Sequence, residues 1–230
     1  ITPGDVVVNS FSFNKNGNTM AASITKPDRQ ADIYTVSSSG GYKRLTNINP
    51  QIDNWIKPKI SLVSWTGANG DLVEGILELP PDYNNDNPLP LVVIIHGGPT
   101  SAALYQFRYW IYGRTLLSSK GYATLSPNYR GSTGYGDKFM VDLIGNENDI
   151  DVEDILAGVD AMIEKGIADP KRLGVMGWSN GGFLTNCIIT ADNRFKAASS
   201  GAGVIDQVMQ WGIEDTPGHV INYMTGLPWD

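Results

Sequence analysis

The sequence predicts an α/β fold built on a mostly parallel sheet, with a short all-β segment in front of it. Residues 1–56 contain short strand-like stretches that are separated by glycine turns. From residue 57 onwards, strand-like and helix-like stretches alternate, which is the pattern of a sheet with helices on both faces. Residues 91–95 form a continuous apolar run rich in β-branched side chains, which is typical of a parallel strand buried on both faces.

The first 56 residues have the size and turn pattern of one β-propeller blade. Gly17 and the Gly40–Gly41 pair provide the positive-φ positions that tight hairpins need. A single blade cannot bury both of its faces, so this interpretation implies further blades upstream. The alternative is an ordinary β-hairpin extension of the next domain. Strands are expected at residues 11–13, 20–25, 32–36 and 42–46.

Residues 57–230 are expected to form a second domain with strands and helices in alternation. The helix over 151–165 has the clearest pattern, because Asp151 can cap its start and Gly166 can end it. Its apolar residues fall on one face: Val152, Ile155, Val159, Met162 and Ile163. Other helices are expected over 102–118 and from the glycine turn near 180 to 191, and strands over 60–65, 72–79, 91–95, 122–126, 173–176 and 196–200.

Composition excludes several classes of protein. The net charge of −7 would repel a phosphate backbone, so nucleic-acid binding is not expected. Cys187 is the only cysteine, so no intrachain disulfide can form, and we expect a buried, unreactive thiol. No apolar run approaches the ~20 residues that span a membrane. The chain begins at Ile1 without a Met or a signal-peptide pattern, as an internal fragment would, and we expect a soluble protein with the cytoplasm favoured.

The candidate nucleophile is Ser179. Residues 177–181 fit the pattern G-x-S-x-G and lie between a predicted strand and a predicted helix, which is the context that this motif requires. Gly177 and Gly181 are small enough for strand and helix to approach each other. The helix that starts here also directs N–H groups and a positive dipole end at the serine. The alternative is a purely structural glycine turn.

A second glycine loop, His96-Gly97-Gly98-Pro99, directly follows the predicted strand over 91–95. Its backbone N–H groups can point at a developing oxyanion, as in the HGGG-type loops of hydrolases. The alternative is a plain turn. His96 precedes the serine in the chain, which is the wrong order for the general base, so we expect its side chain to shape this loop by hydrogen bonds.

A third glycine-rich loop, residues 128–136, follows the strand over 122–126. It does not precede a helix in the manner of a phosphate-binding loop, so we expect no nucleotide site there. Arg130 is expected to pair with a carboxylate and hold the loop in place, and the less favoured alternative is a direct role in binding substrate.

Several ordered motifs together resemble the prolyl oligopeptidase family of serine peptidases, and most of all its acylaminoacyl-peptidase and dipeptidyl-peptidase-like branch. They are HGGPTS, NYRGSTGYGD, the acidic helix with the strand and GWSNGG turn after it, and the late GLPWD. The resemblance covers nearly all of residues 57–230, and residues 1–56 are similar to the last propeller blade of that family. It implies an α/β-hydrolase fold with a Ser-Asp-His triad.

The resemblance also implies roles for particular residues. Ser179 would be the nucleophile, and the oxyanion would be bound by the backbone N–H of Asn180 and by one from the glycine loop, that of Gly98 or Gly97, with Gly98 favoured. Neither a cofactor nor a metal ion is implied. Gln207 stands where an aromatic residue is common, so strict proline specificity is not expected. The substrate pocket would include His96, Val204, Gln207 and Trp211.

The triad partners are not evident in this chain. Only His219 follows Ser179, and no strand precedes it, although Asp206 or Asp215 could orient it on paper. We therefore expect the triad Asp and His beyond Asp230, on final strands that this chain lacks. The strand over 196–200 would then be an exposed edge, and the isolated chain would be marginally stable or self-associate.

The sequence thus predicts a serine peptidase that hydrolyses short peptides through an acyl-enzyme on Ser179. Two alternatives stay open, namely an esterase with the same groups and an inactive fragment or non-catalytic scaffold without the triad Asp and His.

Overall fold

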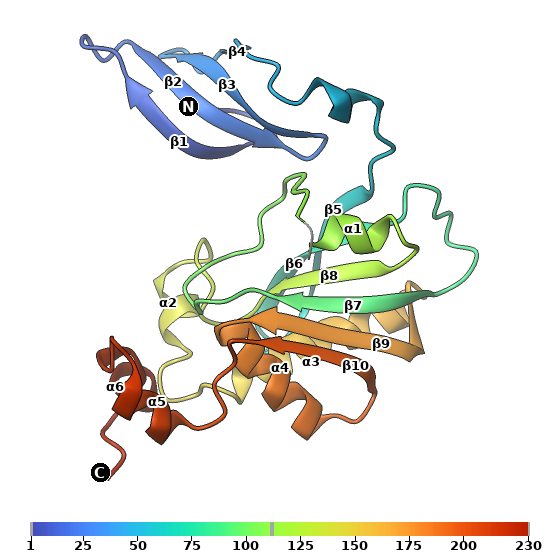
Figure 1. Ribbon diagram of the computed structural model, residues 1–230, viewed down its shortest axis with the longest axis vertical. Helices are drawn as coiled ribbons and strands as arrows, with labels where there is room; N and C mark the ends of the chain where they lie inside the picture. Colours follow the sequence, from blue (N-terminus) through green and yellow to red (C-terminus); the bar gives the residue numbers. More distant parts are fainter. Residues whose placement is uncertain (1, 111–112, 230) are drawn as a thin grey trace.

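The computed structural model describes residues 2–110 and 113–229, which form two separate β-sheets (Figure 1). The first sheet has four strands in the order β1-β2-β3-β4. The second has six strands in the order β10-β9-β7-β8-β6-β5 and carries the helices. A connector that includes the short 3₁₀ helix η1 (Pro50–Asn54) joins them.

The first sheet is an antiparallel meander, as the sequence predicts for a blade-like segment. Each neighbouring pair is antiparallel, and alternate residues on one face form a small core. That core consists of Met20, Ala22, Ile24, Tyr34 and Val36. The strands are β1 (Val7–Phe13), β2 (Thr19–Lys26), β3 (Arg29–Ser37) and β4 (Tyr42–Arg44), so the first is longer than the predicted residues 11–13.

The second sheet is mixed. Strands β7 (Leu89–Ile95), β8 (Ala123–Asn128), β9 (Ala168–Trp178) and β10 (Phe195–Gly201) run parallel to their neighbours among these four. The antiparallel pair β5 (Lys59–Thr66) and β6 (Leu72–Leu79), with η2 (Ala68–Gly70) at its turn, joins this group through β8. The loops after β7, β8 and β9 therefore leave the same edge of the sheet.

Helices cover the second sheet unevenly. The longest, α3 (Ile150–Glu164), packs beside α4 (Asn180–Ala191) on one face, while the short α1 (Arg114–Ser118) lies on the other (Figure 1). Three further short helices are α2 (Asp137–Val141), α5 (Gln207–Ile213) and α6 (Gly218–Met224). In the described residues, no helix is long and apolar enough to cross a membrane.

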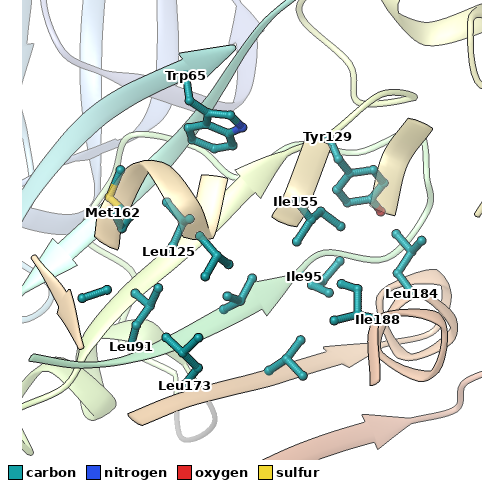
Figure 2. Close-up of a cluster of buried hydrophobic side chains, with 14 of the residues drawn as sticks. Trp65, Leu91, Ile95, Leu125, Tyr129, Ile155, Met162, Leu173, Leu184 and Ile188 are labelled. Atoms are coloured by element: carbon teal, nitrogen blue, oxygen red, sulfur yellow. The ribbon is translucent and has the colours of Figure 1, made fainter. Parts of the chain in front are cut away.

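The main core lies between the sheet and the α3–α4 pair, as Figure 2 shows. On β7, Leu91, Val93 and Ile95 point into it and are buried, whereas Val92 and Ile94 are only half-buried. The prediction that this strand is buried on both faces is therefore wrong. The physical reason is that α1, on the other face, packs on β6 and β8 and leaves β7 less covered.

The predicted helix over 102–118 is also shorter than expected. Only its last turns form α1, and residues 102–110 form an irregular loop, while residues 111–112 lie outside the described residues. The Arg114 guanidinium pairs with Glu78 and donates to the carbonyls of Leu104 and Gln106, which holds the loop. The backbone N–H of Phe107 donates to the Lys26 carbonyl at 2.8 Å, which ties the loop to the first sheet.

Arg130 pairs with a carboxylate, as the sequence predicts. Its Nε lies 3.3 Å from Asp154 Oδ2 on α3, and both side chains are buried. Asp154 also accepts hydrogen bonds from the backbone N–H groups of Arg130 and Ala68, at 2.9 and 2.8 Å. Because charges buried this way need several partners, the network fixes the loop after β8 against α3.

Candidate active site

Ser179 occupies a sharp turn between β9 and α4. Its φ and ψ are 59° and −126°, outside the ordinary regions for a residue with a side chain. Such strain costs about 1–3 kcal/mol and persists only where the surroundings impose it. A Cβ on Gly177 would lie 2.2 Å from the Gly181 carbonyl oxygen, and one on Gly181 would lie 2.2 Å from that of Ile95. Both glycines are therefore required for the close approach of strand and helix.

The serine is fixed by its backbone while its side chain stays accessible. Its N–H donates to the Gly201 carbonyl at 2.9 Å, and its own carbonyl accepts from Phe183 N–H at 3.0 Å. The residue is exposed, and within the described part of the chain no group hydrogen-bonds to its Oγ. The backbone thus presents a free hydroxyl at the start of α4, where the helix dipole favours negative charge.

The His96–Pro99 loop lies directly beside this hydroxyl. A Cβ on Gly97 would be 2.9 Å from the Trp178 carbonyl oxygen and 3.8 Å from Ser179 Oγ, so only glycine allows the contact. Across residues 2–110 and 113–229, no protein group accepts a hydrogen bond from the backbone N–H of Gly97, Gly98 or Asn180. Unpaired N–H groups beside a nucleophile are what an oxyanion hole needs.

His96 is tied into the loop, as the sequence predicts. Its Nδ1 lies 2.9 Å from the Gly97 carbonyl oxygen, its Nε2 lies 3.0 Å from Ser132 Oγ, and its ring stacks on Tyr129 with centroids 4.5 Å apart. Burial lowers the pKa of His96, so the imidazole is neutral. Both ring nitrogens already have partners, so His96 is not arranged to take a proton from Ser179.

His219, the other histidine, lies on α6 with its ring against Tyr223 at a centroid distance of 4.7 Å. Asp206 caps α5, because its Oδ1 accepts from the Met209 N–H at 3.0 Å. In the described chain neither Asp206 nor Asp215 hydrogen-bonds to His219, and His219 does not hydrogen-bond to Ser179. The geometry therefore gives the in-chain triad no support.

The three other residues of the predicted pocket lie on the segment after β10. The Val204 carbonyl accepts from Asn186 Nδ2 on α4 at 3.2 Å, which keeps this segment near the elbow. Gln207 begins α5, and the Trp211 ring packs edge-on against Trp229 at 4.9 Å. Among the described residues, neither Gln207 nor Trp211 forms a hydrogen bond or ring contact with Ser179. A hollow of about 500 Å³ lies elsewhere, between the connector and α1, and none of the predicted site residues lines it.

Three titratable residues interact near the start of α3 and along α4, namely Glu147 and Cys187, which are half-buried, and Asp151, which is buried. Burial, reinforced by the charge of Glu147, raises the pKa of Asp151 to about 7, and burial alone raises that of Glu147 to about 7. Burial, followed by the charges of Asp151 and Glu147, raises the pKa of Cys187 to about 11. Its Sγ donates to Asn148 Oδ1 at 3.2 Å. The thiol therefore stays protonated, as expected of an unreactive cysteine, although Cys187 is half-buried and not buried as the sequence predicts.

Sequence reasoning missed Tyr129. This wholly buried residue follows β8, its Oη lies 2.7 Å from the His96 carbonyl oxygen, and Asn180 Nδ2 lies 3.2 Å from the same Oη. The available signal was its place at the carboxyl end of a parallel strand beside the other two loops. Its partners lie 33 and 51 positions away in the chain, however, and no local pattern connects them.

A serine at positive φ between a parallel strand and a helix, next to a glycine loop from the neighbouring parallel strand, defines the α/β-hydrolase class. The sequence comparison then specifies the family. Residues 108–230, more than half of the chain, match the prolyl oligopeptidase family. The chain belongs to this family.

Individual relatives agree with this family. The chain is 35% identical over 219 residues to the uncharacterized peptidase YuxL of Bacillus subtilis, covering 90% of the chain and 32% of that protein. It is 44% identical over 131 residues to the acylamino-acid-releasing enzyme of Arabidopsis thaliana, covering 56% of the chain and 16% of the enzyme. Among solved structures, an acylaminoacyl peptidase in complex with Z-Gly-Gly-Phe-chloromethyl ketone superposes with a TM-score of 0.86 at 25% identity, covering 97% of this chain and 35% of that one. The chain thus spans between 16% and 35% of the length of these proteins.

Proposed function

We propose that this chain is part of a serine peptidase that hydrolyses short peptides through an acyl-enzyme on Ser179. One observation carries the proposal, namely the strained backbone of Ser179, which presents an exposed hydroxyl beside the Gly97–Gly98 loop. Strain of this kind is retained where function requires it. The family and the peptide-like ligand named for the similar acylaminoacyl peptidase support a peptide substrate.

The reaction proceeds in two steps. Ser179 Oγ attacks the scissile carbonyl carbon while a general base takes the hydroxyl proton, and the oxygen of the tetrahedral intermediate accepts from the N–H groups of Asn180 and Gly98. The base then gives the proton to the leaving amine as the C–N bond breaks. Water, activated by the same base, hydrolyses the ester on Ser179 and regenerates the hydroxyl.

The base is proposed to come from outside these 230 residues. Both histidines of the chain have other surroundings, His96 in the glycine loop and His219 on α6. The relatives are about three times as long as this chain, which leaves room for a His and an Asp in the remaining sequence. In the same proposal, residues 1–56 are the last blade of a propeller and residues 57–230 belong to the catalytic domain.

A fluorophosphonate probe tests the nucleophile and the base together. We expect the full-length gene product to be labelled rapidly, Ser179→Ala to abolish labelling, and the 230-residue chain to react at least about a hundredfold more slowly, because the hydroxyl lacks a base. His219→Ala should leave the rate unchanged in both. Labelling that survives in Ser179→Ala would refute the nucleophile, and rapid labelling of the short chain that depends on His219 would refute the external base.

Substrate preference separates peptidase from esterase. Full-length protein is compared on an acylaminoacyl anilide, a dipeptidyl anilide and a simple p-nitrophenyl ester. We expect kcat/KM to favour the amides over the ester once intrinsic reactivity is divided out, and we expect no strict requirement for proline. A preference for the simple ester would overturn the peptidase proposal.

Self-association of the isolated chain is also proposed, through the open edge of β10. Residues 196–200 of this strand are exposed, and among the strands of residues 2–110 and 113–229, β10 pairs with β9 alone. An unpaired strand edge is a template for pairing with a second copy.

A further inference from the structure

We propose that Tyr129 is a positioning residue that, with the Asn180 side chain, aligns the peptide groups of the oxyanion hole. The inference rests on the proposed function and goes beyond it, because it assigns a role to a side chain that touches neither nucleophile nor substrate. Three loops meet at Tyr129, from β7, β8 and β9, and its hydroxyl bonds to both of the others.

The chemistry of the two partners fixes the direction of each hydrogen bond. The His96 carbonyl can only accept, so the Tyr129 hydroxyl donates its one proton to it, at 2.7 Å. Asn180 Nδ2 can only donate, so it donates to a lone pair of the same Oη, at 3.2 Å. Turning the Asn180 amide over would place two acceptors in contact. The phenol therefore joins the elbow to the glycine loop in a single arrangement.

The bond to His96 orients the first peptide of the oxyanion loop. A peptide unit is planar, and the carbonyl of His96 shares its plane with the N–H of Gly97 on the opposite side. Holding that carbonyl therefore sets the direction of the Gly97 N–H. The next unit is held in the same way, because His96 Nδ1 lies 2.9 Å from the Gly97 carbonyl oxygen, whose plane contains the Gly98 N–H. The directions of the Gly97 and Gly98 N–H groups are thus set by the carbonyls of the same peptide units, those of His96 and Gly97.

The second anchor depends on Tyr129 as well. A neutral imidazole that donates from Nδ1 must accept at Nε2, where Ser132 Oγ lies 3.0 Å away. The ring is pressed against Tyr129, with an interplanar angle of 18°. Ser132 Oγ also lies 2.6 Å from the Tyr129 carbonyl oxygen, and because the hydroxyl has a single proton, this carbonyl and His96 Nε2 share it.

Burial also keeps the proton of the Tyr129 hydroxyl in place at neutral pH. Tyr129 is wholly buried, and burial raises the pKa of its phenol above the ordinary value. Tyr129 and His96 are therefore fixed before substrate arrives, and no reorganisation is needed when negative charge develops. Preorganised donors of this kind act on the transition state rather than on the bound substrate.

The experiment compares two tyrosines of one loop in the full-length gene product. Tyr129→Phe removes the hydroxyl and keeps the ring that stacks on His96. Tyr135→Phe is the matched control, because its hydroxyl also accepts from an asparagine amide, Asn128 Nδ2 at 2.8 Å, without reaching the glycine loop. Asn180→Ala is a second arm that keeps the backbone N–H. Peptide-anilide kcat and KM, the fluorophosphonate labelling rate and the unfolding midpoint are measured for each, with Ser179→Ala as the blank.

We expect Tyr129→Phe to lower kcat and the labelling rate by about tenfold or more, less than the ~10²–10³ of losing an oxyanion donor outright, with KM within twofold. Asn180→Ala should lower the same two rates by a few-fold, and Tyr135→Phe should leave them unchanged. Equal rates in Tyr129→Phe and Tyr135→Phe, or losses confined to KM, would overturn the inference. If Tyr129→Phe does not fold, unchanged rates in the half-buried Asn180→Ala would overturn it. Activity that persists in Ser179→Ala would instead overturn the proposed function.

Discussion

Strands β7 and β10 have the same neighbour, β9, and both run parallel to it, yet they are opposite in character. β7 buries Leu91, Val93 and Ile95 against the α3–α4 pair, whereas residues 196–200 of β10 are exposed. Small residues suit β10 for a local reason, because a Cβ on Gly201 would lie 2.3 Å from the Trp178 ring and Ser200 Oγ donates to the Gly182 carbonyl. The elbow therefore lies between a strand held by apolar burial and a strand held by hydrogen bonds and close contacts.

The largest change in the free energy of unfolding should come from truncating a buried side chain of β7. Leu91→Ala removes a side chain that is 1% exposed, and we expect it to cost about 2–5 kcal/mol in the free energy of unfolding. Lys196→Ala on β10 should change it by less than about 0.5 kcal/mol. Urea unfolding of the three proteins measures both. Equal costs would show that the two strands contribute alike and would break the comparison.

A smaller change in the free energy of unfolding is expected from the carboxyl group of Asp151, which lies on α3 at the helix-covered face of the sheet. The pKa of Asp151 is about 7, above its ordinary 3.8, so the folded protein holds a proton that the unfolded chain loses. Stability therefore falls as pH rises from about 4 to about 7 and stays reduced above that range. Asp151→Asn removes the charge and keeps the oxygen that accepts from Val152 N–H. We expect a gain of about 1–2 kcal/mol at pH 8 and none at pH 4.

Thermal unfolding of Asp151→Asn at both pH values provides the check. Glu147→Gln, which removes the neighbouring charge, should produce a smaller gain in the same direction. A gain that is the same at pH 4 and pH 8 would show that ionisation of Asp151 is not its cause.

The smallest expected effect concerns the open edge. Ser199→Lys adds a charge to β10, and we expect it to weaken self-association of the 230-residue chain by about tenfold, which corresponds to about 1.4 kcal/mol, because charged side chains block edge pairing. Ser39→Lys adds the same charge in a turn of the first sheet. Sedimentation over a range of concentrations compares the two. If both variants associate equally, β10 is not the interface.

The sequence could predict the features that local patterns determine, but not those that depend on contacts between distant residues. The elbow at Ser179 and the helix over 151–165 follow from local patterns, and the structure confirms both, with α3 one residue earlier at each end. The predicted cap is wrong, because Asp149 is at the N-cap and Asp151 lies inside α3. The predicted helix over 102–118 is wrong because Arg114 and Lys26 hold residues 102–110 through contacts that no local spacing encodes. Tyr129 was missed for the same reason. Local patterns predicted the candidate nucleophile and the turn that holds it, but the contacts that support this turn come from distant positions in the chain.

One backbone hydrogen bond connects the edge strand β10 directly to Ser179. The N–H of Ser179 donates to the carbonyl of Gly201, so the last rung between β9 and β10 is made by the candidate nucleophile itself. Peeling β10 away from its exposed side would release this rung and let the left-handed serine relax before the buried strands open. Loss of Ser179 reactivity would then precede loss of secondary structure during unfolding. The reactivity of the serine would thus indicate whether β10 is still paired with β9.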